Sequence, residues 1–297
     1  MPNLPPEPPR IPFTHHRVTT DDGVDLAVQS TGAGPPVLLG NGIGVTAPGL
    51  NFIADHLRDR HRVICWDYRG VGESWLAGNH VGFTMERHAR DALQLLDALG
   101  EERAAMLGWS MGVPVGLEMI RQAPDRVAGY GALFGAPGQP FRAAFPRPAA
   151  ALVHLAVRFA RHNPWPAQAV LRLGATLPIL SWAICSTVGF VGKEASRDTF
   201  QADVRSTAGA DKRAYFNTMF EMMHHDASDL LPSVRCPVLI VAGENDWVTP
   251  PDAAQRMADA TPDCEFVMLP STSHFGVIEH GPELWGPIDR LLDKAFG

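Results

Sequence analysis

The sequence predicts an α/β fold: a mostly parallel central sheet with helices on both faces and a helical cap inserted between the sixth and seventh strands. Short apolar runs typical of buried strands alternate with longer runs of helical periodicity. This alternation stops near residue 138 and resumes after residue 232. With 45% hydrophobic and 19% charged residues among 297, the chain has enough apolar side chains for a sizeable core, which excludes disorder over most of its length.

Six strands are expected in the first half of the chain. Residues 16–20 and 24–30 flank Asp21-Asp22-Gly23, a strong hairpin signal. The remaining strands are expected at 37–39, 62–66, 104–108 and 127–134, and helices at 50–57, 85–99 and 111–122. The helix at 85–99 has the clearest signal, because it carries one apolar stripe and is followed by Gly100.

Residues 138–232 contain helical segments and no convincing strand. These helices are expected at 149–161, 166–173, 195–208 and 212–225. Strands at 238–242 and 265–269 then alternate with helices at 251–260 and 282–295. We therefore predict a flexible Pro-rich tail (1–12), a core domain formed by 13–137 and 233–297, and a helical cap insertion (138–232).

One segment of the cap, residues 173–192, is uncharged and long enough to cross a bilayer. Gly174, Pro178 and Gly189 interrupt it, however, so a broken helical element is expected in place of a membrane span. Its apolar side chains need a partner surface. We expect them to face the mouth of the active site, with Ile179 as the test position.

Composition also bears on partners and location. The 25 Lys and Arg against 32 Asp and Glu give a net charge of −7, and no three basic residues are consecutive, so no nucleic-acid partner is expected. The four Cys form no C-x-x-C pair and are expected as reduced thiols. The start of the chain lacks the apolar core of a signal peptide, which predicts a cytoplasmic protein.

The strongest chemical motif is Gly108-Trp109-Ser110-Met111-Gly112, which matches G-x-S-x-G. It lies between a predicted strand and a predicted helix. Such a sharp turn holds the serine in a strained conformation with its hydroxyl exposed, and the flanking glycines avoid a Cβ clash. Ser110 is therefore the candidate nucleophile, and the Met111 N–H is a candidate oxyanion donor.

A serine nucleophile needs a base and an acid that orients the base. Asp246 and His274 each follow a predicted strand, and the order Ser, Asp, His agrees with that arrangement. Glu244 and Asp252 are rival acids, and His280 is a rival base. Asp91 lies on a predicted helix, where we expect it to be solvated.

Three further motifs carry a family resemblance. They are Asp67-Tyr68-Arg69-Gly70-Val71-Gly72-Glu73-Ser74, Gly243-Glu244-Asn245-Asp246 and Ser273-His274-Phe275. With the nucleophile motif, they make residues 16–297 resemble the α/β-hydrolase-fold superfamily, specifically its esterase-like serine hydrolases with a helical cap. The resemblance implies Asp246 as the acid, His274 as the base and a cap that roofs the site.

The resemblance also implies a second oxyanion donor in the loop after Leu39. The family often has His-Gly-x there, whereas this chain has Asn41-Gly42-Ile43, so the Ile43 N–H is the expected donor. The run Asn-Gly-Ile-Gly is similar to that of intracellular medium-chain polyhydroxyalkanoate depolymerases. Relatives that use an Asp nucleophile, the haloalkane dehalogenases and epoxide hydrolases, are disfavoured because position 110 is Ser.

The expected function is cofactor-free hydrolysis of small carboxylic esters with apolar, short-to-medium acyl chains through an acyl-enzyme. Candidate substrate-binding residues are Asn41, Trp109, Trp182 and Met219. Alternatives are a lactonase, a polyhydroxyalkanoate depolymerase-like enzyme, a carbon–carbon bond hydrolase, or a signalling receptor that binds its ligand on the same fold. A carbon–carbon bond hydrolase tends to need a cation for the substrate carboxylate, for which the cap offers Arg161, Arg172 and Arg197.

Neither a metal nor a nucleotide is expected at the site. Adjacent histidines, as in His15-His16 and His224-His225, point in different directions and rarely share one ion. The glycines at 40, 42 and 44 do not have the G-x-G-x-x-G spacing of a dinucleotide fingerprint.

Overall fold

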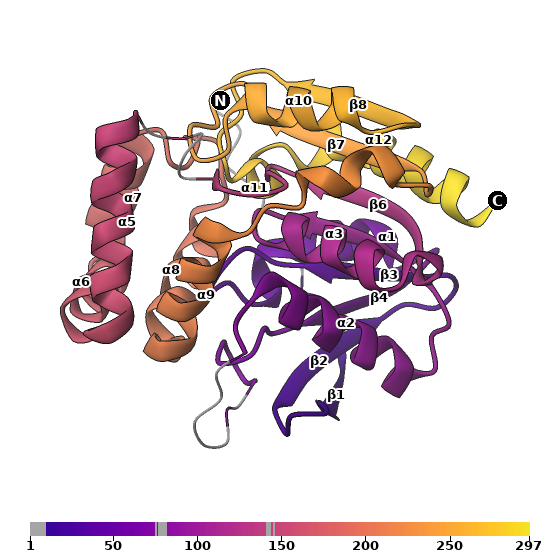
Figure 1. Ribbon diagram of the computed structural model, residues 1–297, viewed down its shortest axis with the longest axis horizontal. Helices are drawn as coiled ribbons and strands as arrows, with labels where there is room; N and C mark the ends of the chain where they lie inside the picture. Colours follow the sequence, from indigo (N-terminus) through magenta and orange to yellow (C-terminus); the bar gives the residue numbers. More distant parts are fainter. Residues whose placement is uncertain (1–9, 75, 77–81, 141–143, 145) are drawn as a thin grey trace.

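A computed structural model of the chain describes residues 10–74, 76, 82–140, 144 and 146–297. Most of the predicted tail, residues 1–9, lies outside these described residues. Figure 1 shows a central sheet with strand order β1-β2-β4-β3-β5-β6-β7-β8. The strands are β1 (Thr14–Thr19), β2 (Asp25–Thr31), β3 (Pro36–Gly40), β4 (Arg62–Trp66), β5 (Ala104–Trp109), β6 (Val127–Leu133), β7 (Val238–Gly243) and β8 (Cys264–Leu269).

The sheet is mostly parallel, as predicted. β1 pairs with β2 and β2 with β4 in antiparallel fashion, and every other pairing is parallel. The predicted hairpin forms at Asp21-Asp22-Gly23, where Gly23 has a φ of 82° and the Thr20 N–H donates to the Val24 carbonyl at 2.9 Å. The central strands β5, β6 and β7 are buried along their whole length, which explains their continuously apolar sequences.

Helices cover both faces of the sheet. One face packs against α2 (Met85–Leu99), α3 (Gly112–Gln122) and α10 (Pro251–Ala260). The other packs against α1 (Asn51–Leu57), α11 (Gly276–Glu279) and α12 (Gly281–Phe296). The 3₁₀ turn η1 (Ala47–Leu50) precedes α1, and the 3₁₀ turn η2 (Pro124–Arg126) precedes β6. Because the parallel strands end at one edge, the loops that follow β3, β5, β7 and β8 meet there.

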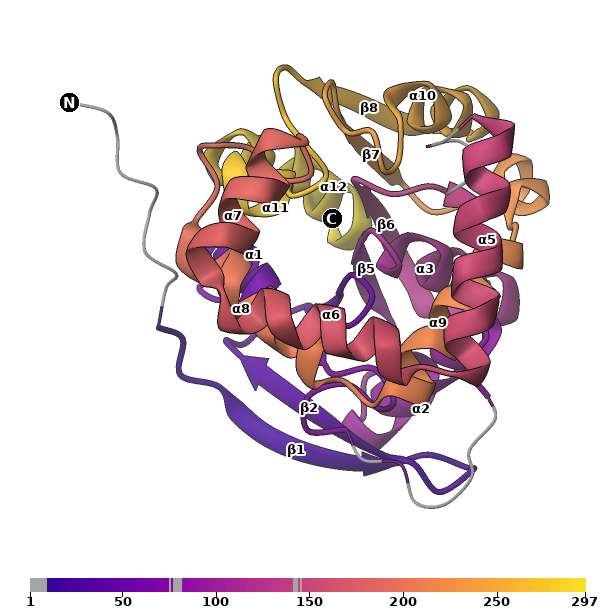
Figure 2. The ribbon, with the colours of Figure 1, turned by 90° about the vertical axis from the view of Figure 1, so that its left-hand side faces the viewer.

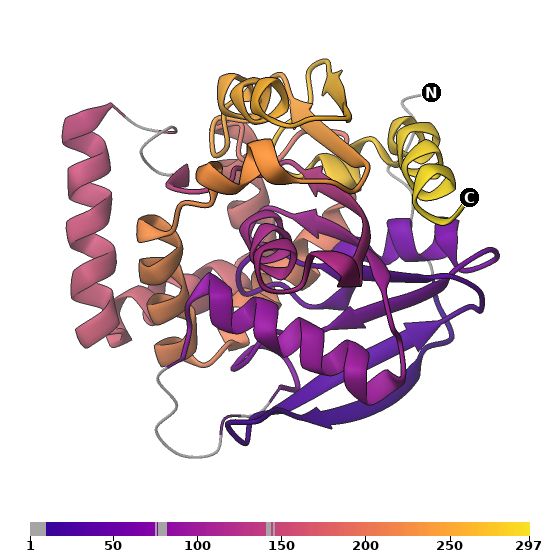
Figure 3. The same ribbon diagram turned by 45° about the vertical axis from the view of Figure 1, so that its right-hand side comes forward.

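The helical cap is inserted between β6 and β7. Its helices are α5 (Arg147–His162), α6 (Trp165–Thr176), α7 (Pro178–Thr187), α8 (Arg197–Gly209), α9 (Lys212–His224) and the 3₁₀ helix η3 (Ser228–Ser233). Gly138 and Asp226 form an antiparallel bridge where the chain enters and leaves the cap. Figures 1 and 3 show α5 at the left edge of the molecule, with the orange helix α9 between it and the core.

The uncharged segment 173–192 is broken, as predicted. α6 ends at Thr176, α7 begins at Pro178, and the two helices meet at 104°. Within the described residues no single helix has the length and apolar character to cross a membrane, although this bent pair passes that test when its two helices are combined. Pro178 explains the break, because proline cannot donate a backbone hydrogen bond inside a continuing helix.

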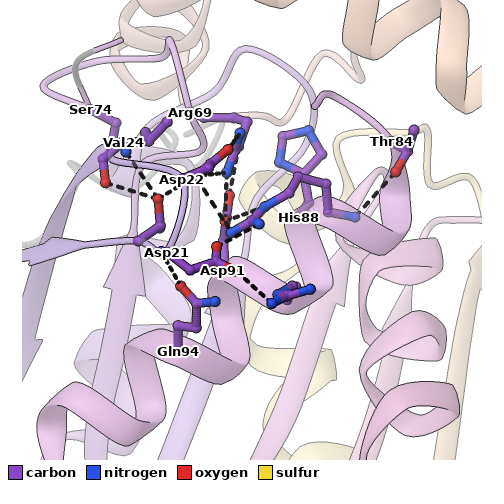
Figure 4. A network of polar contacts seen from close by, with 12 residues as sticks. Asp21, Asp22, Val24, Arg69, Ser74, Thr84, His88, Asp91 and Gln94 are labelled. Atoms are coloured by element: carbon purple, nitrogen blue, oxygen red, sulfur yellow. Dashed lines mark hydrogen bonds and ion pairs between the residues drawn. The ribbon is translucent and has the colours of Figure 1, made fainter. Parts of the chain in front are cut away.

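The loop Asp67–Ser74 anchors the core through a buried ionic network (Figure 4). Arg69, whose side chain is fully buried, donates two hydrogen bonds of 2.7 Å to the carboxylate of Asp91 and one of 2.8 Å to Asp22. The expectation that Asp91 is solvated is therefore wrong. Its carboxylate turns inward because Arg69 and Arg87 converge on it, which compensates for its desolvation.

His88 lies beside this network, fully buried, with its ring edge-on to Tyr68 at 5.0 Å (Figure 4). Burial, together with the nearby charges of Arg69 and Arg87, lowers the pKa of His88 to about 3. In the unfolded chain a histidine titrates near 6.5. The stabilisation from neutral His88 is thus fully present above about pH 6.5 and is lost as the pH falls toward 3.

When the pH is lowered from 7.5 to 5.5, the free energy of unfolding of the parent protein should decrease. We expect this decrease to be about 1 kcal/mol larger in the parent than in His88→Gln. The measurement is urea unfolding at both pH values. His162→Gln is the matched control, because His162 is exposed at the end of α5 and its replacement should leave the parental pH dependence. Equal pH dependence in the parent and His88→Gln would contradict the assignment.

Candidate active site

The turn between β5 and α3 holds Ser110 in the predicted strained conformation. Ser110 has a φ of 53°, and its backbone N–H donates to the Leu133 carbonyl at 3.1 Å. A Cβ on Gly108 would come within 2.3 Å of the Gly112 carbonyl oxygen, and a Cβ on Gly112 within 2.4 Å of the Gly40 oxygen. Only glycine fits at these two positions, so the motif fixes the turn that presents the Ser110 hydroxyl.

Ser110, His274 and Asp246 lie in one hydrogen-bonded chain. His274 Nε2 is 2.9 Å from Ser110 Oγ, and His274 Nδ1 is 2.9 Å from Asp246 Oδ2. His274 and Asp246 are buried, whereas Ser110 is partly exposed. The geometry is that of a nucleophile, a base and an orienting acid. The rivals lie elsewhere: Glu244 accepts from the Ser271 N–H, Asp252 is in the first turn of α10, and His280 is 3.8 Å from Glu283.

The loop after β7 holds the Asp246 carboxylate rigidly. Its Oδ1 accepts from the N–H groups of Val248 and Thr249, both at 2.9 Å, and its Oδ2 accepts from the Thr249 hydroxyl at 2.7 Å. Thr249 is a residue that the sequence analysis missed, because nothing in the sequence distinguishes this hydroxyl from others near Asp246. These bonds leave Oδ2 directed at His274, which favours one orientation of the imidazole ring.

Two neighbouring contacts position His274. The indole N–H of Trp109 donates to the His274 carbonyl at 3.0 Å. Glu279 accepts from the N–H of Ser273 at 2.9 Å and from the N–H of Gly192 at 2.7 Å, and it also bonds the Ser273 hydroxyl. Glu279 therefore ties the loop that carries His274 to the segment that follows α7 in the cap.

The two predicted oxyanion donors are free to bind a substrate oxygen. Among the described residues, neither the Ile43 nor the Met111 N–H donates a backbone hydrogen bond. Met111 directly precedes the first residue of α3, so the positive end of the helix dipole lies nearby. Ile43 lies in the loop after β3 and lines the cavities next to Ser110.

Two cavities meet at Ser110, and both walls are mainly apolar. The larger, of about 300 Å³, extends under α6, α7 and α8, and the smaller, of about 180 Å³, extends toward α9. A third cavity of about 550 Å³ between α5 and α9 does not contact Ser110 and is not assigned to the site. The residues that line both cavities at Ser110 are Ile43, Ser110, Phe190, Tyr215 and His274.

Two of the four predicted substrate-binding residues line a cavity at Ser110, and two do not. Trp109 lines the larger cavity and Met219 the smaller. Asn41 and Trp182 line neither of these cavities. Trp182 is buried against Phe200, with ring centroids 5.5 Å apart. Asn41 is buried after β3, and neither polar atom of its side chain forms a hydrogen bond with any described residue.

The uncharged segment of the cap contributes to the larger cavity through Gly174, Ser181, Cys185 and Phe190. Ile179 does not contribute: it is 87% exposed and lines neither of the two cavities at Ser110. The expectation that Ile179 faces the mouth is therefore wrong, because the bend before α7 turns this position to the outer surface of the cap.

Asp203 of α8 is a second residue that the sequence did not single out. It lines the larger cavity, and neither carboxyl oxygen has a hydrogen-bond partner among the residues that the structure describes. Burial raises the pKa of Asp203 well above its usual value, because desolvation disfavours the charged carboxylate. Asp203 is the one carboxyl group among the described residues that line the larger cavity.

None of the three cap arginines lines either cavity. Arg161 lies over the ring of Phe220 at 4.4 Å, Arg197 lies over Trp182 at 5.1 Å, and Arg172 is exposed. The alternative of a carbon–carbon bond hydrolase needs a cation beside Ser110 to bind a substrate carboxylate. None of these three arginines is placed to provide it.

Comparisons with known proteins identify the family of the chain. A family model described as the alpha/beta hydrolase fold matches residues 35–281. The chain is 26% identical to the pimeloyl-[acyl-carrier protein] methyl ester esterase of Chromobacterium violaceum, over 86% of this chain and 94% of that protein. It is 33% identical to the uncharacterized hydrolase YraK of Bacillus subtilis, but only over 35% of this chain and 39% of that protein.

A solved structure extends the likeness to the whole fold. The thermophilic esterase of Thermogutta terrifontis superposes with a TM-score of 0.75 at 24% identity, over 96% of this chain and all of that one. The family match spans both sides of the cap and includes the nucleophile turn, the Asp246 loop and the His274 loop. The chain therefore belongs to the alpha/beta hydrolase fold family.

Proposed function

We propose that this protein is a serine hydrolase that cleaves carboxylic esters with apolar, short-to-medium acyl chains through an acyl-enzyme. The observation that carries the proposal is the continuous chain from Asp246 to His274 to Ser110, with 2.9 Å at each step, where two apolar cavities meet. The pairing of an activated serine with apolar walls suits an ester of limited polarity.

In the proposed reaction, Ser110 Oγ attacks the ester carbonyl carbon while His274 Nε2 takes the hydroxyl proton. The carbonyl oxygen becomes negative and is held by the Ile43 and Met111 N–H groups. His274 then gives its proton to the leaving alcohol, which departs as the acyl-enzyme forms. Water repeats the sequence, with His274 as the base, and releases the acid and free Ser110.

Asp246 accepts the Nδ1 hydrogen of His274 and stabilises the imidazolium form of His274 in both steps. The junction of the two cavities at Ser110 supports a division of the substrate, with the acyl group on one side and the alcohol on the other. The same chemistry opens a lactone, in which the two parts are joined in a ring. The substrate of a polyhydroxyalkanoate depolymerase-like enzyme is also an ester. These alternatives therefore share one mechanism and differ only in the substrate.

The test is a series of p-nitrophenyl esters with acyl chains from C2 to C16. We expect kcat/KM to rise by up to about fourfold for each methylene that becomes buried, and to fall once the chain exceeds the cavity. A succinyl half-ester should react at least about tenfold more slowly than the butyryl ester, since its carboxylate must be desolvated among apolar side chains. Equal rates for the charged and uncharged acyl groups would contradict the apolar specificity.

Turnover number separates an enzyme from a receptor that retains the triad. With ester in hundredfold excess over protein, the hydrolase releases many equivalents of p-nitrophenol. A receptor that reacts once would release about one equivalent and stop. The latter result would overturn the proposed function even if Ser110 were acylated.

A further inference from the structure

The outer surface of the cap is apolar to an unusual extent. Among the described residues, eleven of the thirteen exposed large apolar side chains lie between Leu152 and Val188, in α5, α6, α7 and the turns between and after α6 and α7. We call this surface the outer cap face. Its apolar members are Leu152, Leu155, Phe159, Trp165, Val170, Leu173, Leu177, Ile179, Leu180, Ile184 and Val188.

These side chains belong to three helices that follow one another in the chain and to the turns beside them. On α5, Leu152, Leu155 and Phe159 are three and four residues apart, so they share one side of the helix. Figure 2 shows α5, α6 and α7 in front of α8 and α9, so the three helices are the outermost elements on this side of the molecule. Soluble monomers rarely expose a contiguous apolar surface of this kind without a partner for it.

The charge of this region is opposite to that of the whole chain. The sequence has no Asp or Glu between Asp125 and Glu194, although the chain carries 32 acidic residues and a net charge of −7. Arg147, Arg158 and Arg172 are exposed on α5 and α6 and form no ion pair with any described residue. Arg161 does have a partner, Glu221 of the inner helix α9, at 3.9 Å.

Apolar and cationic side chains together indicate which partner fits. A second copy of the chain would place the same arginines against one another, which costs energy through like-charge repulsion. An anionic lipid surface offers acyl chains for the apolar residues and phosphates for the arginines. The chemistry of the face therefore favours a lipid surface over self-association.

The helices are too short to cross such a membrane. α6 has 12 residues and α7 has 10, which correspond to about 18 and 15 Å against a hydrocarbon core of about 30 Å. Their 104° bend also prevents them from acting as one straight span. They are suited to lie along the surface, with the polar backbone satisfied inside each helix.

We propose that the outer cap face docks on an anionic lipid surface, with its apolar side chains at the boundary between headgroups and acyl chains and with Arg147, Arg158 and Arg172 at lipid phosphates. Val170 connects this face to the candidate active site, because it is 70% exposed and also lines the larger cavity. Docking thus brings the rim of that cavity to the interface, where apolar esters partition. Only this last consequence rests on the proposed function.

The test is co-sedimentation of the full chain with vesicles. We expect binding to vesicles of equal parts phosphatidylglycerol and phosphatidylcholine, at least about tenfold weaker binding to pure phosphatidylcholine, and loss of binding as salt rises from 50 to 500 mM. Ile179→Asp and Leu155→Asp should each weaken binding at least about tenfold. Arg158→Glu and Arg172→Glu should each weaken it by about fivefold or more.

Two matched controls lie away from the cap. Met268→Asp on the edge strand β8 and Arg256→Glu on α10 make the same chemical changes and should leave vesicle binding unaltered. Unfolding curves of Ile179→Asp should match those of the parent, because the side chain is exposed and outside both cavities. Ser110→Ala should still bind vesicles, so failure of catalysis and failure of docking are separate results.

Three results would overturn the proposal. The parent fails to bind the anionic vesicles, or it binds and the cap variants bind equally well. In the third, the parent sediments as a dimer that Ile179→Asp converts to a monomer, with no vesicle binding by either protein. That outcome would assign the outer cap face to contact between copies of the chain.

Discussion

Ser110→Ala should lower kcat/KM for a short p-nitrophenyl ester by at least about 10³-fold. The substitution removes the oxygen that forms the acyl bond and leaves only the oxyanion donors and the cavity to assist attack by water. Ser110 lies at φ 53°, a conformation that alanine inherits unchanged, so the stability of the variant should remain close to that of the parent. Steady-state kinetics and urea unfolding measure the two quantities separately.

Non-additivity provides a second measurement on the same site. Ser110 and His274 act as one unit, so removing both should cost little more than removing Ser110 alone. The kcat/KM of Ser110→Ala/His274→Ala should lie within about tenfold of that of Ser110→Ala. Ser228→Ala is the control, because Ser228 is exposed in η3 and lies in neither cavity that contacts Ser110. Activity of Ser110→Ala within tenfold of the parent would refute the assigned nucleophile.

Asp91→Ala should destabilise the fold by about 3–5 kcal/mol, the largest stability effect that we expect from a single substitution. It removes two hydrogen bonds to the fully buried Arg69 and leaves a guanidinium with only Asp22 to compensate for its desolvation. It also removes the hydrogen bond of 2.9 Å from Arg87 to the same carboxylate, which leaves Arg87 paired with Asp21 at 2.7 Å. The measurement is the unfolding free energy from urea titration.

Asp97→Ala on the same helix is the matched control for that loss. The Asp97 side chain is 61% exposed and pairs with Arg126 at 2.7 Å, so its removal should cost no more than about 1 kcal/mol. Circular dichroism before the titration establishes that both variants are folded. If Asp91→Ala costs no more than Asp97→Ala, the buried network does not stabilise the fold as argued.

Sequence periodicity predicted the elements of this fold well. The helix at 85–99 has the predicted bounds, and the predicted hairpin, parallel strands and cap insertion all form. These features depend on neighbours in the chain: the spacing of apolar residues, a glycine that ends a helix, and a proline that breaks one. Such signals are local, so they can be recognised without knowing what packs against each element.

The positions of the strand ends and the family resemblance together predicted which residues meet at the site, because Ser110, Asp246 and His274 each follow a strand of one parallel sheet. Strand ends of that kind converge at a common edge whatever the details of packing. The cap residues that line the cavities above that edge were less predictable. Trp182 was expected at the substrate and instead packs on Phe200, and Asp203 lines the cavity without any signal in its neighbours.

The direction of a side chain on a cap helix depends on the angle at which that helix docks. Ile179 was expected to face the active-site mouth, but the 104° bend after α6 turns it outward. Asp91 was expected in solvent, but Arg69 reaches it from a loop 22 residues earlier in the chain. The sequence by itself determined the fold, the order of its elements and the meeting of the triad. Only the tertiary structure decided which polar groups are buried together and which apolar face is left uncovered, because these properties depend on contacts between segments that no local pattern encodes.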